Sequence, residues 1–268
     1  MQRAIWAAVV VVVGGVAAYF FMQQEKAPPP PAPPPPKIAR DPVPAAPQVV
    51  APAIRHPLSG AGGAGLPDLE QSDAPILQAL GEFLGRKWLV FILGDGVIQR
   101  VVITVDNLPR ERLPAGAMPL KRVPKAFVTT GRGDTLAIGP RNWARYAAHV
   151  RLVAAVDAAK LVAVYVRFYP LFQRAYEELG NPKAYFNDRL VVAIDDLLAA
   201  PELSGPIKLV QPGVHYEFAD PALEARSAGQ KLMIRMGRDN AVLVKAKLRE
   251  IRRLVATGAS ASSEAGRK

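Results

Sequence analysis

The order of hydrophobic and polar residues begins with an uncharged run of 19 residues from Ala4 to Met22. A helix of that length spans roughly 30 Å, the thickness of the hydrocarbon core of a bilayer. Because the run lacks the polar stripe of a soluble core helix, it predicts a transmembrane helix over residues 4–22. A cleaved signal peptide is the alternative, since residues 16–18 are small enough for a cleavage site. The apolar residues that continue to Met22 favour an uncleaved anchor.

Proline interrupts the hydrophobic pattern over residues 23–66, where 13 of the 26 prolines fall between Ala27 and Pro57. Proline has no N–H group and a fixed φ, so such a segment adopts extended polyproline II instead of a helix or a sheet. A glycine-rich hinge follows over residues 58–66. We therefore predict a disordered, proline-rich linker that holds a domain away from a membrane; a ligand for a proline-binding module is the alternative.

Apolar residues recur at helical spacing through most of residues 67–256, a length that can bury a substantial core. The longest stripe follows Asp157, which we expect to cap a helix that is kinked at Pro170. Its inward positions are predicted to be Leu161, Tyr165, Phe168, Phe172, Tyr176 and Leu179. Further helices are expected over residues 142–156, from Asp220 to about Met236, and after caps at Ser72 or Asp73, at Asn187 or Asp188, and at Asp239 or Asn240.

Strand patterns are fewer and shorter. Residues 127–130 and 135–138 predict a hairpin, and residues 207–210 and 214–218 flank a turn at Pro212-Gly213. Residues 97–105 are apolar and β-branched, so that helix and strand are both open there. The fold class that we predict is mainly helical α+β, with one globular domain that carries a short β-hairpin and minor strands. A polar tail over residues 257–268 is expected to be disordered.

The composition excludes several kinds of site. The chain has no cysteine, which excludes disulfides, zinc–thiolate and iron–sulfur centres and a cysteine nucleophile. It has only three histidines, which disfavours a histidine-rich metal site. We expect no metal and no cofactor. The net charge of +11 and the pI near 10 are typical of nucleic-acid-binding proteins, but residues 58–257 carry only 27 basic against 20 acidic residues. The charge excess is therefore local.

The flanking charges favour one orientation of the predicted transmembrane helix. Arg3 and the α-amino group precede the helix, whereas Glu25 and Lys26 nearly cancel after it. Residues 1–3 are then cytoplasmic, and the domain is periplasmic. The predicted location is the inner membrane, with a single pass, and the lack of cysteine agrees with an oxidising compartment. Nucleic acid is an improbable partner there.

Three groups of polar residues are candidate contacts. The Asp106 cluster is Asp106, Asn107 and Arg110, and the Tyr185 cluster is Tyr185, Asn187, Asp188 and Arg189. In the second, Asp188 and Arg189 could form a local ion pair or hold a carboxylate ligand. The basic stripe of the last predicted helix is Lys245, Arg249, Arg252 and Arg253, which could neutralise an anionic partner. Capping, structural ion pairs and a solvated helix face are the alternative interpretations.

Several segments resemble a known family. They are TVDNLPRERLP from Thr104, YPLFQRAYEELG from Tyr169, YFNDRLVVAIDDLLA from Tyr185, LVQPGVHYEFADPALEARSAGQKLMIRMG from Leu209 and the Lys-x-Lys-Leu-Arg-Glu run from Lys245. Together they are similar to a proteobacterial family of domains of unknown function, numbered 3014, from about Asp68 to Val255. The resemblance implies an N-terminal membrane segment, a proline-rich spacer and one domain, with no assigned activity.

The leading hypothesis from these patterns is a binding or scaffold module for an envelope protein or an anionic glycan. The alternative is an envelope hydrolase or transferase that uses Asp106, Asp188 or Glu217 together with Arg189. That alternative requires at least two of these groups to converge in one concave pocket. The neighbours Asp195 and Asp196 point about 100° apart on a helix and make a poor catalytic pair. DNA binding would require the opposite membrane topology. The sequence does not indicate an oligomeric state.

Overall fold

The computed structural model describes residues 53–60, 65–114 and 116–258. The predicted transmembrane helix over residues 4–22, most of the proline-rich linker and the tail from residue 259 lie outside the described residues. Within the described ranges, no helix combines the length and the hydrophobicity that a membrane span needs.

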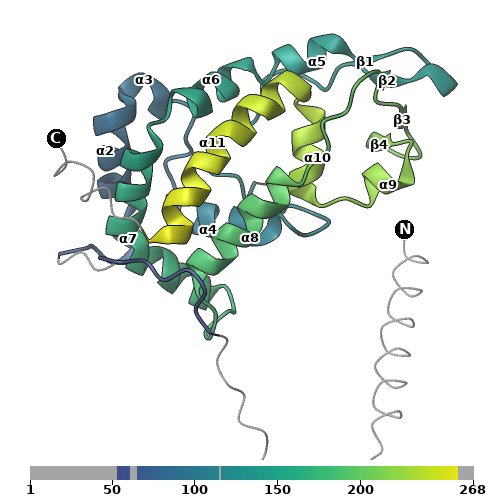
Figure 1. Ribbon diagram of the computed structural model, residues 1–268. Coiled ribbons are helices and arrows are strands. Elements are labelled where there is room, and N and C mark those ends of the chain that lie inside the picture. Colours follow the sequence, from purple (N-terminus) through teal and green to yellow (C-terminus); the bar gives the residue numbers. More distant parts are fainter. Residues whose placement is uncertain (1–52, 61–64, 115, 259–268) are drawn as a thin grey trace, which may run out of the picture. The chain divides into compact units, whose positions relative to one another are not determined.

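The described residues are mainly helical and carry two short strand pairs (Figure 1). The helices are α2 (Asp73–Leu84), α3 (Arg86–Leu89), α4 (Val97–Asn107), α5 (Pro140–Ala144), α6 (Ala147–Ala155), α7 (Ala158–Glu178), α8 (Phe186–Leu198), α9 (Pro221–Glu224), α10 (Ala228–Arg235) and α11 (Arg238–Thr257), with 3₁₀ turns η1 (Leu69–Gln71) and η2 (Gly133–Thr135). Helices α4, α7, α8 and α11 pack together, and α2 packs on α7. The predicted mainly helical class is confirmed.

The predicted hairpin and the two further strand candidates all form strand pairs, although the strands are shorter than expected. Strand β1 (Thr129–Thr130) pairs antiparallel with β2 (Ala137–Ile138), and β3 (Leu209–Val210) pairs antiparallel with β4 (Glu217–Phe218). An isolated bridge between Ala137 and Lys208 joins the two pairs. In Figure 1 both pairs lie with α9 on one side of α11, opposite α2, α3 and α7.

Residues 97–105, for which helix and strand were both open, form most of α4. The start of this helix is stabilised from α2, because the two carboxylate oxygens of Asp73 accept hydrogen bonds from the backbone N–H groups of Gly96 and Val97, each at 2.8 Å. Asp73 lies more than 20 residues earlier, so no local capping pattern marks the start of α4. Ile98, Val102 and Val105, at helical spacing, are buried.

Helix α7 begins as predicted, since the side chain of Asp157 accepts a hydrogen bond from the backbone N–H of Lys160 at 3.0 Å. Pro170 lies inside the helix, and the kink expected there stays a prediction. Most of the predicted stripe faces the core, where the rings of Phe172 and Phe186 stack with centroids 5.9 Å apart. Leu179 was assigned to this stripe incorrectly: it follows the last residue of α7 and is 40% exposed.

Other predicted helix boundaries require correction. Helix α8 begins at Phe186 after Tyr185, so neither Asn187 nor Asp188 is its N-cap. The helix expected from Asp220 to Met236 is two helices, because Ser227 caps α10 separately by accepting a hydrogen bond from the backbone N–H of Gln230 at 3.0 Å. The helix expected over residues 142–156 likewise divides into α5 and α6. Helix α11 starts directly after Gly237, so neither Asp239 nor Asn240 is its N-cap.

Candidate functional site

The structure brings the Asp106 and Tyr185 clusters together through one buried carboxylate. The side chain of Asp106 accepts a hydrogen bond from Arg110 Nη2 at 2.6 Å and from Arg189 Nε at 3.0 Å. Arg189 also donates to the backbone carbonyl of Asp106. The local ion pair between Asp188 and Arg189 is therefore not formed. Instead, Arg189 links α8 to the end of α4, and both charges of the contact are satisfied inside the domain.

The rest of the Tyr185 cluster holds the chain that enters the domain. The carboxylate of Asp188 accepts from the backbone N–H groups of Arg55 and His56 at 3.0 and 2.8 Å. The hydroxyl of Tyr185 accepts from the backbone N–H of Leu58 at 3.1 Å. We call Tyr185, Asn187 and Asp188 the linker clamp, because residues 55–58 belong to the segment that was assigned to the linker.

Asn187 is the fully buried centre of the linker clamp. Its Nδ2 donates to the backbone carbonyls of His56 and Val255 at 2.8 and 3.0 Å, and its Oδ1 accepts from the hydroxyl of Tyr165 at 3.2 Å. These bonds connect the entering chain, α7 and the last turns of α11. The candidate residues of the Tyr185 cluster are therefore occupied by contacts within the chain.

The basic stripe is smaller than predicted. Lys245 is 4% exposed, and its Nζ donates to the backbone carbonyl of Ala200 at 2.6 Å and to Glu202 at 3.1 Å, so its assignment to a solvated stripe was wrong. The hydrogen bond and the charge of Lys245 lower the pKa of the Glu202 carboxyl. Arg252 is paired with Asp195 of α8.

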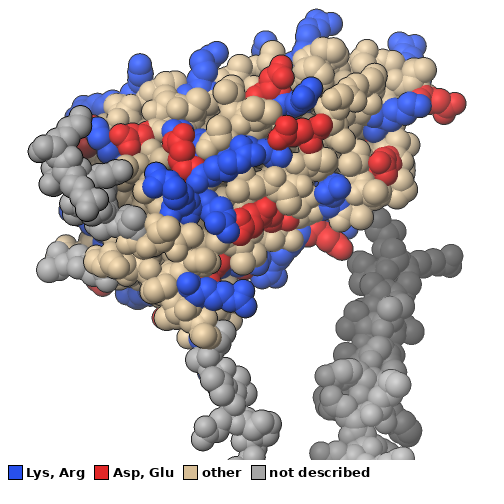
Figure 2. Space-filling view, viewed as in Figure 1, with Lys and Arg blue, Asp and Glu red and all other residues tan. Residues whose placement is uncertain are grey.

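Two arginines of the stripe remain available to a partner. Arg249 and Arg253 are exposed on α11, and neither forms an ion pair within the part of the chain that the structure describes. Figure 2 shows that lysine and arginine are interspersed with aspartate and glutamate on the face where α11 lies. The charge of this face is therefore mixed, and the available basic surface is the Arg249–Arg253 pair.

The remaining candidates do not assemble a catalytic site. Asn107 donates to the carbonyl of Ile103 within α4, at 2.8 Å, and Glu217 is exposed on β4, which packs against β3 and α9. Asp196 accepts from Ser227 at the start of α10, so it points away from Asp195, as expected. No group of three or more histidines or carboxylates in the described ranges is arranged to hold a metal ion.

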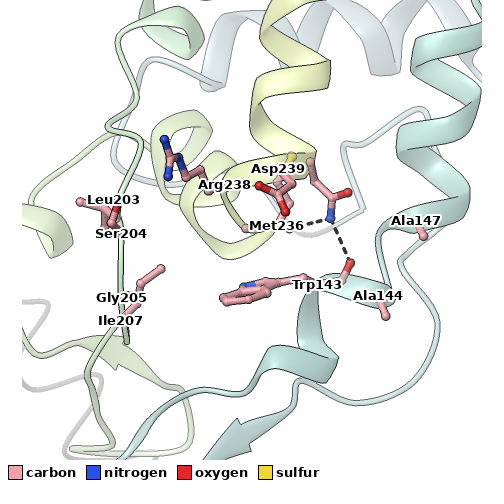
Figure 3. A pocket seen from close by; sticks show the side chains of 12 residues that line it. Trp143, Ala144, Ala147, Leu203, Ser204, Gly205, Ile207, Met236, Arg238 and Asp239 are labelled. Atoms are coloured by element: carbon pink, nitrogen blue, oxygen red, sulfur yellow. Dashed lines mark hydrogen bonds between the residues drawn. The ribbon is translucent and has the colours of Figure 1, made fainter.

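A surface pocket of about 410 Å³ lies at the start of α11 (Figure 3). The ring of Trp143 forms one wall and packs against Gly237, which has a φ of +90°. A Cβ atom at this position would lie 2.6 Å from the indole, so only glycine fits. Asn240 donates to the backbone carbonyls of Trp143 and Met236 at 3.0 and 2.8 Å. Arg238 and Asp239 also line the pocket but form no ion pair with each other. No acid–base pair is assembled here.

A second cavity of about 320 Å³ lies among α2, α4, α7, α8 and α11. We call it the core cavity. Every residue that lines it is aliphatic or aromatic, and Tyr165 alone carries a polar side-chain atom. None of the candidate residues Asp106, Asp188, Arg189 and Glu217 lines either cavity, so the condition for the hydrolase hypothesis is not met by these two sites.

The lining of the core cavity is its most unusual property. It is almost entirely apolar, and the side chains that face the open space lack packing partners on that side, which an apolar occupant could supply. Ligand sites begin at about 300 Å³, and they commonly lie between the helices of a bundle. Sequence reasoning missed this cavity because each lining residue has the pattern of an ordinary core residue.

Comparison with protein families gives one match. A family model described as "Protein of unknown function (DUF3014)" matches residues 97–252, which is more than half of the chain. The match begins at the first residue of α4 and ends within α11, so it includes the Asp106 cluster, the Tyr185 cluster and most of the basic stripe. No curated protein and no solved structure matches the chain.

Proposed function

Since the chain belongs to the DUF3014 family, for which no activity is described, we propose from its structure that the domain is a binding module and not an enzyme. One observation carries this proposal. The candidate carboxylates Asp106 and Asp188 are occupied by contacts within the chain, whereas Arg249 and Arg253 face solvent on α11. Their partner would be anionic, either an acidic surface of an envelope protein or an anionic glycan.

The setting that we propose is the inner membrane. The uncharged run over residues 4–22 would anchor the chain, and the proline-rich segment would extend the domain into the periplasm. This arrangement would limit the partner to molecules of the envelope. It would also separate the basic surface from nucleic acid.

The topology has a direct test. A C-terminal alkaline phosphatase fusion to the full chain is expected to be active, because the enzyme needs the disulfides that form in the periplasm. A green fluorescent protein fusion at the same end is expected to stay dark when the chain is exported through the general secretory route. The reverse pair of results would place the domain in the cytoplasm and would remove the envelope partner.

Charge reversal tests the basic surface. The double variant Arg249→Glu and Arg253→Glu is expected to weaken retention of the full chain on immobilised dextran sulfate by roughly tenfold, because each surface charge contributes up to about 1 kcal/mol. The wild-type interaction should weaken with added salt, since exposed charges are screened.

A matched control separates the effect of charge on α11 from the effect of the net charge of the protein. Arg132 and Arg141 are also exposed arginines, but they lie on the hairpin and on α5. The double variant Arg132→Glu and Arg141→Glu has the same net charge as the first and should retain most of the binding. Equal losses of dextran sulfate binding in the two double variants would contradict a specific role for α11. Binding that changes neither with added salt nor with charge reversal would contradict the electrostatic mechanism.

A further inference from the structure

We propose that the core cavity binds a single unbranched hydrocarbon chain, the tail of an anionic amphiphile. This site is distinct from the outer surface of α11. Only the assignment of an anionic head group rests on the proposed function, because it uses the same exposed arginine, Arg249. The hydrocarbon part rests on the cavity itself.

The walls of the cavity select an apolar occupant. Val101 of α4, Phe172 of α7, Ala193 of α8 and Ile251 of α11 each line the cavity, and all of these side chains are hydrocarbon. The one polar side-chain atom, the hydroxyl of Tyr165, already donates to Asn187. A polar ligand would therefore lose its hydrogen bonds to water without replacement, which is strongly unfavourable. Water is also a poor occupant, since a buried water molecule needs two to four polar partners and the one polar atom in the walls is already bonded.

The volume sets the length of the chain that fits. A group of about the size of a water molecule or a methylene occupies ~30 Å³. The cavity volume of about 320 Å³ is then filled by roughly ten such groups in a row. This number corresponds to the alkyl tail of a medium-chain amphiphile and excludes a two-tailed lipid as a fully enclosed ligand.

The charge beside the cavity selects the head group. Leu161 of α7, Leu197 of α8 and Leu248 of α11 line the cavity and are partly exposed, as are lining residues of the other helices. In this proposal the open rim of the cavity lies between α7, α8 and α11. Arg249 follows Leu248 directly and is exposed. Helix α11 thus supplies a hydrocarbon wall on its inner side and a positive charge on its outer side. An anionic head group at the rim would complement that charge.

A chain-length series tests the proposal with defined probes. The full chain is held in a steroid-based detergent, which has no flexible alkyl tail to compete, and is titrated with saturated carboxylates from hexanoate to hexadecanoate by calorimetry. Affinity is expected to rise about fourfold per methylene, the gain for burial of one such group, until the tail has roughly ten methylenes. It should then level off. Absence of binding across the series, or affinity without any dependence on length, would overturn the proposal.

Filling the cavity provides the second test. Ala193 is buried and lines the cavity, so Ala193→Leu should weaken dodecanoate binding at least tenfold and shift the best length by about three carbons toward shorter tails. Val101→Phe fills the cavity from α4 and should act in the same direction. Ala163→Leu adds the same atoms as Ala193→Leu on the exposed side of α7 and should bind as the wild type does. If neither filling variant folds, the length series decides by itself.

One further probe separates this proposal from the proposed function. Dodecanol has the same tail as dodecanoate but no charge. We expect dodecanol to bind more weakly than dodecanoate in the wild type, and the Arg249→Glu variant to remove that difference. Equal binding of the two probes in the wild type would refute the anionic head group while leaving the hydrocarbon site supported. If the wild type fails to bind dextran sulfate but binds dodecanoate, the proposed function of the α11 surface is contradicted and the hydrocarbon site is not.

Discussion

Replacement of Asp106 by alanine is expected to lower the free energy of unfolding by about 3–5 kcal/mol, the usual range when one partner of a buried ion pair is removed. Asp106 is 5% exposed, and Arg189, whose side chain is 21% exposed, would lose its carboxylate partner. The cost arises mainly because a positive charge would remain in a poorly solvated position between α4 and α8. Urea unfolding of the full chain, followed by circular dichroism, measures the change.

Two further variants test whether the loss of stability depends on burial of the ion pair. The side chain of Arg110 bonds to the same carboxylate but is 56% exposed, so Arg110→Ala should cost no more than about 1 kcal/mol. The double variant Asp106→Leu and Arg189→Leu removes both buried charges and should recover most of the lost stability, because apolar replacements of buried pairs are often neutral. A loss in Asp106→Ala as small as that in Arg110→Ala would contradict the stabilising role of the buried pair.

The parts of the fold that sequence could predict depend on neighbours within a few residues. The cap at Asp157, the buried stripe of α7 and the turn between β1 and β2 are all of this kind. Helix and strand stayed open for residues 97–105 partly because the carboxylate that caps α4, that of Asp73, comes from another helix. The division between α9 and α10 was missed although Ser227 is a good N-cap residue, since the apolar pattern continues across it.

The candidate residues were recognised correctly as unusual, but their roles were not. Asp106 and Arg189 are polar residues in apolar segments, and such residues are either functional or paired when the fold buries them. Their separation of 83 residues conceals the pairing. Lys245 lies on the turn of α11 that contacts Ala200, so a helix pattern alone could not tell it from the exposed Arg249. A cavity has no sequence pattern at all, because packing depends on how the elements meet.

Replacement of Asn187 by alanine is expected to lower the free energy of unfolding by about 2–4 kcal/mol and to release the entering chain from the domain. The buried carbonyl of Val255, the partly buried carbonyl of His56 and the hydroxyl of Tyr165 would each lose a hydrogen-bond partner. Unsatisfied buried polar groups cost more than the net value of the bonds that are lost. Urea unfolding measures the change in the free energy of unfolding.

Limited trypsin digestion measures the release of the entering chain, because Arg55 is an exposed cleavage site whose backbone N–H is bonded to Asp188. In Asn187→Ala we expect cleavage after Arg55 to be at least about tenfold faster than in the wild type, since a loss of 1.4 kcal/mol or more in local stability increases the open population by that factor. Asn107→Ala is the matched control, because Asn107 bonds only to Ile103 within its own helix and is partly exposed. Its cleavage rate should equal that of the wild type. Unchanged cleavage in Asn187→Ala would mean that Asp188 and Tyr185 hold residues 55–58 without Asn187, and the double variant Tyr185→Phe and Asp188→Asn would then be the one that releases them.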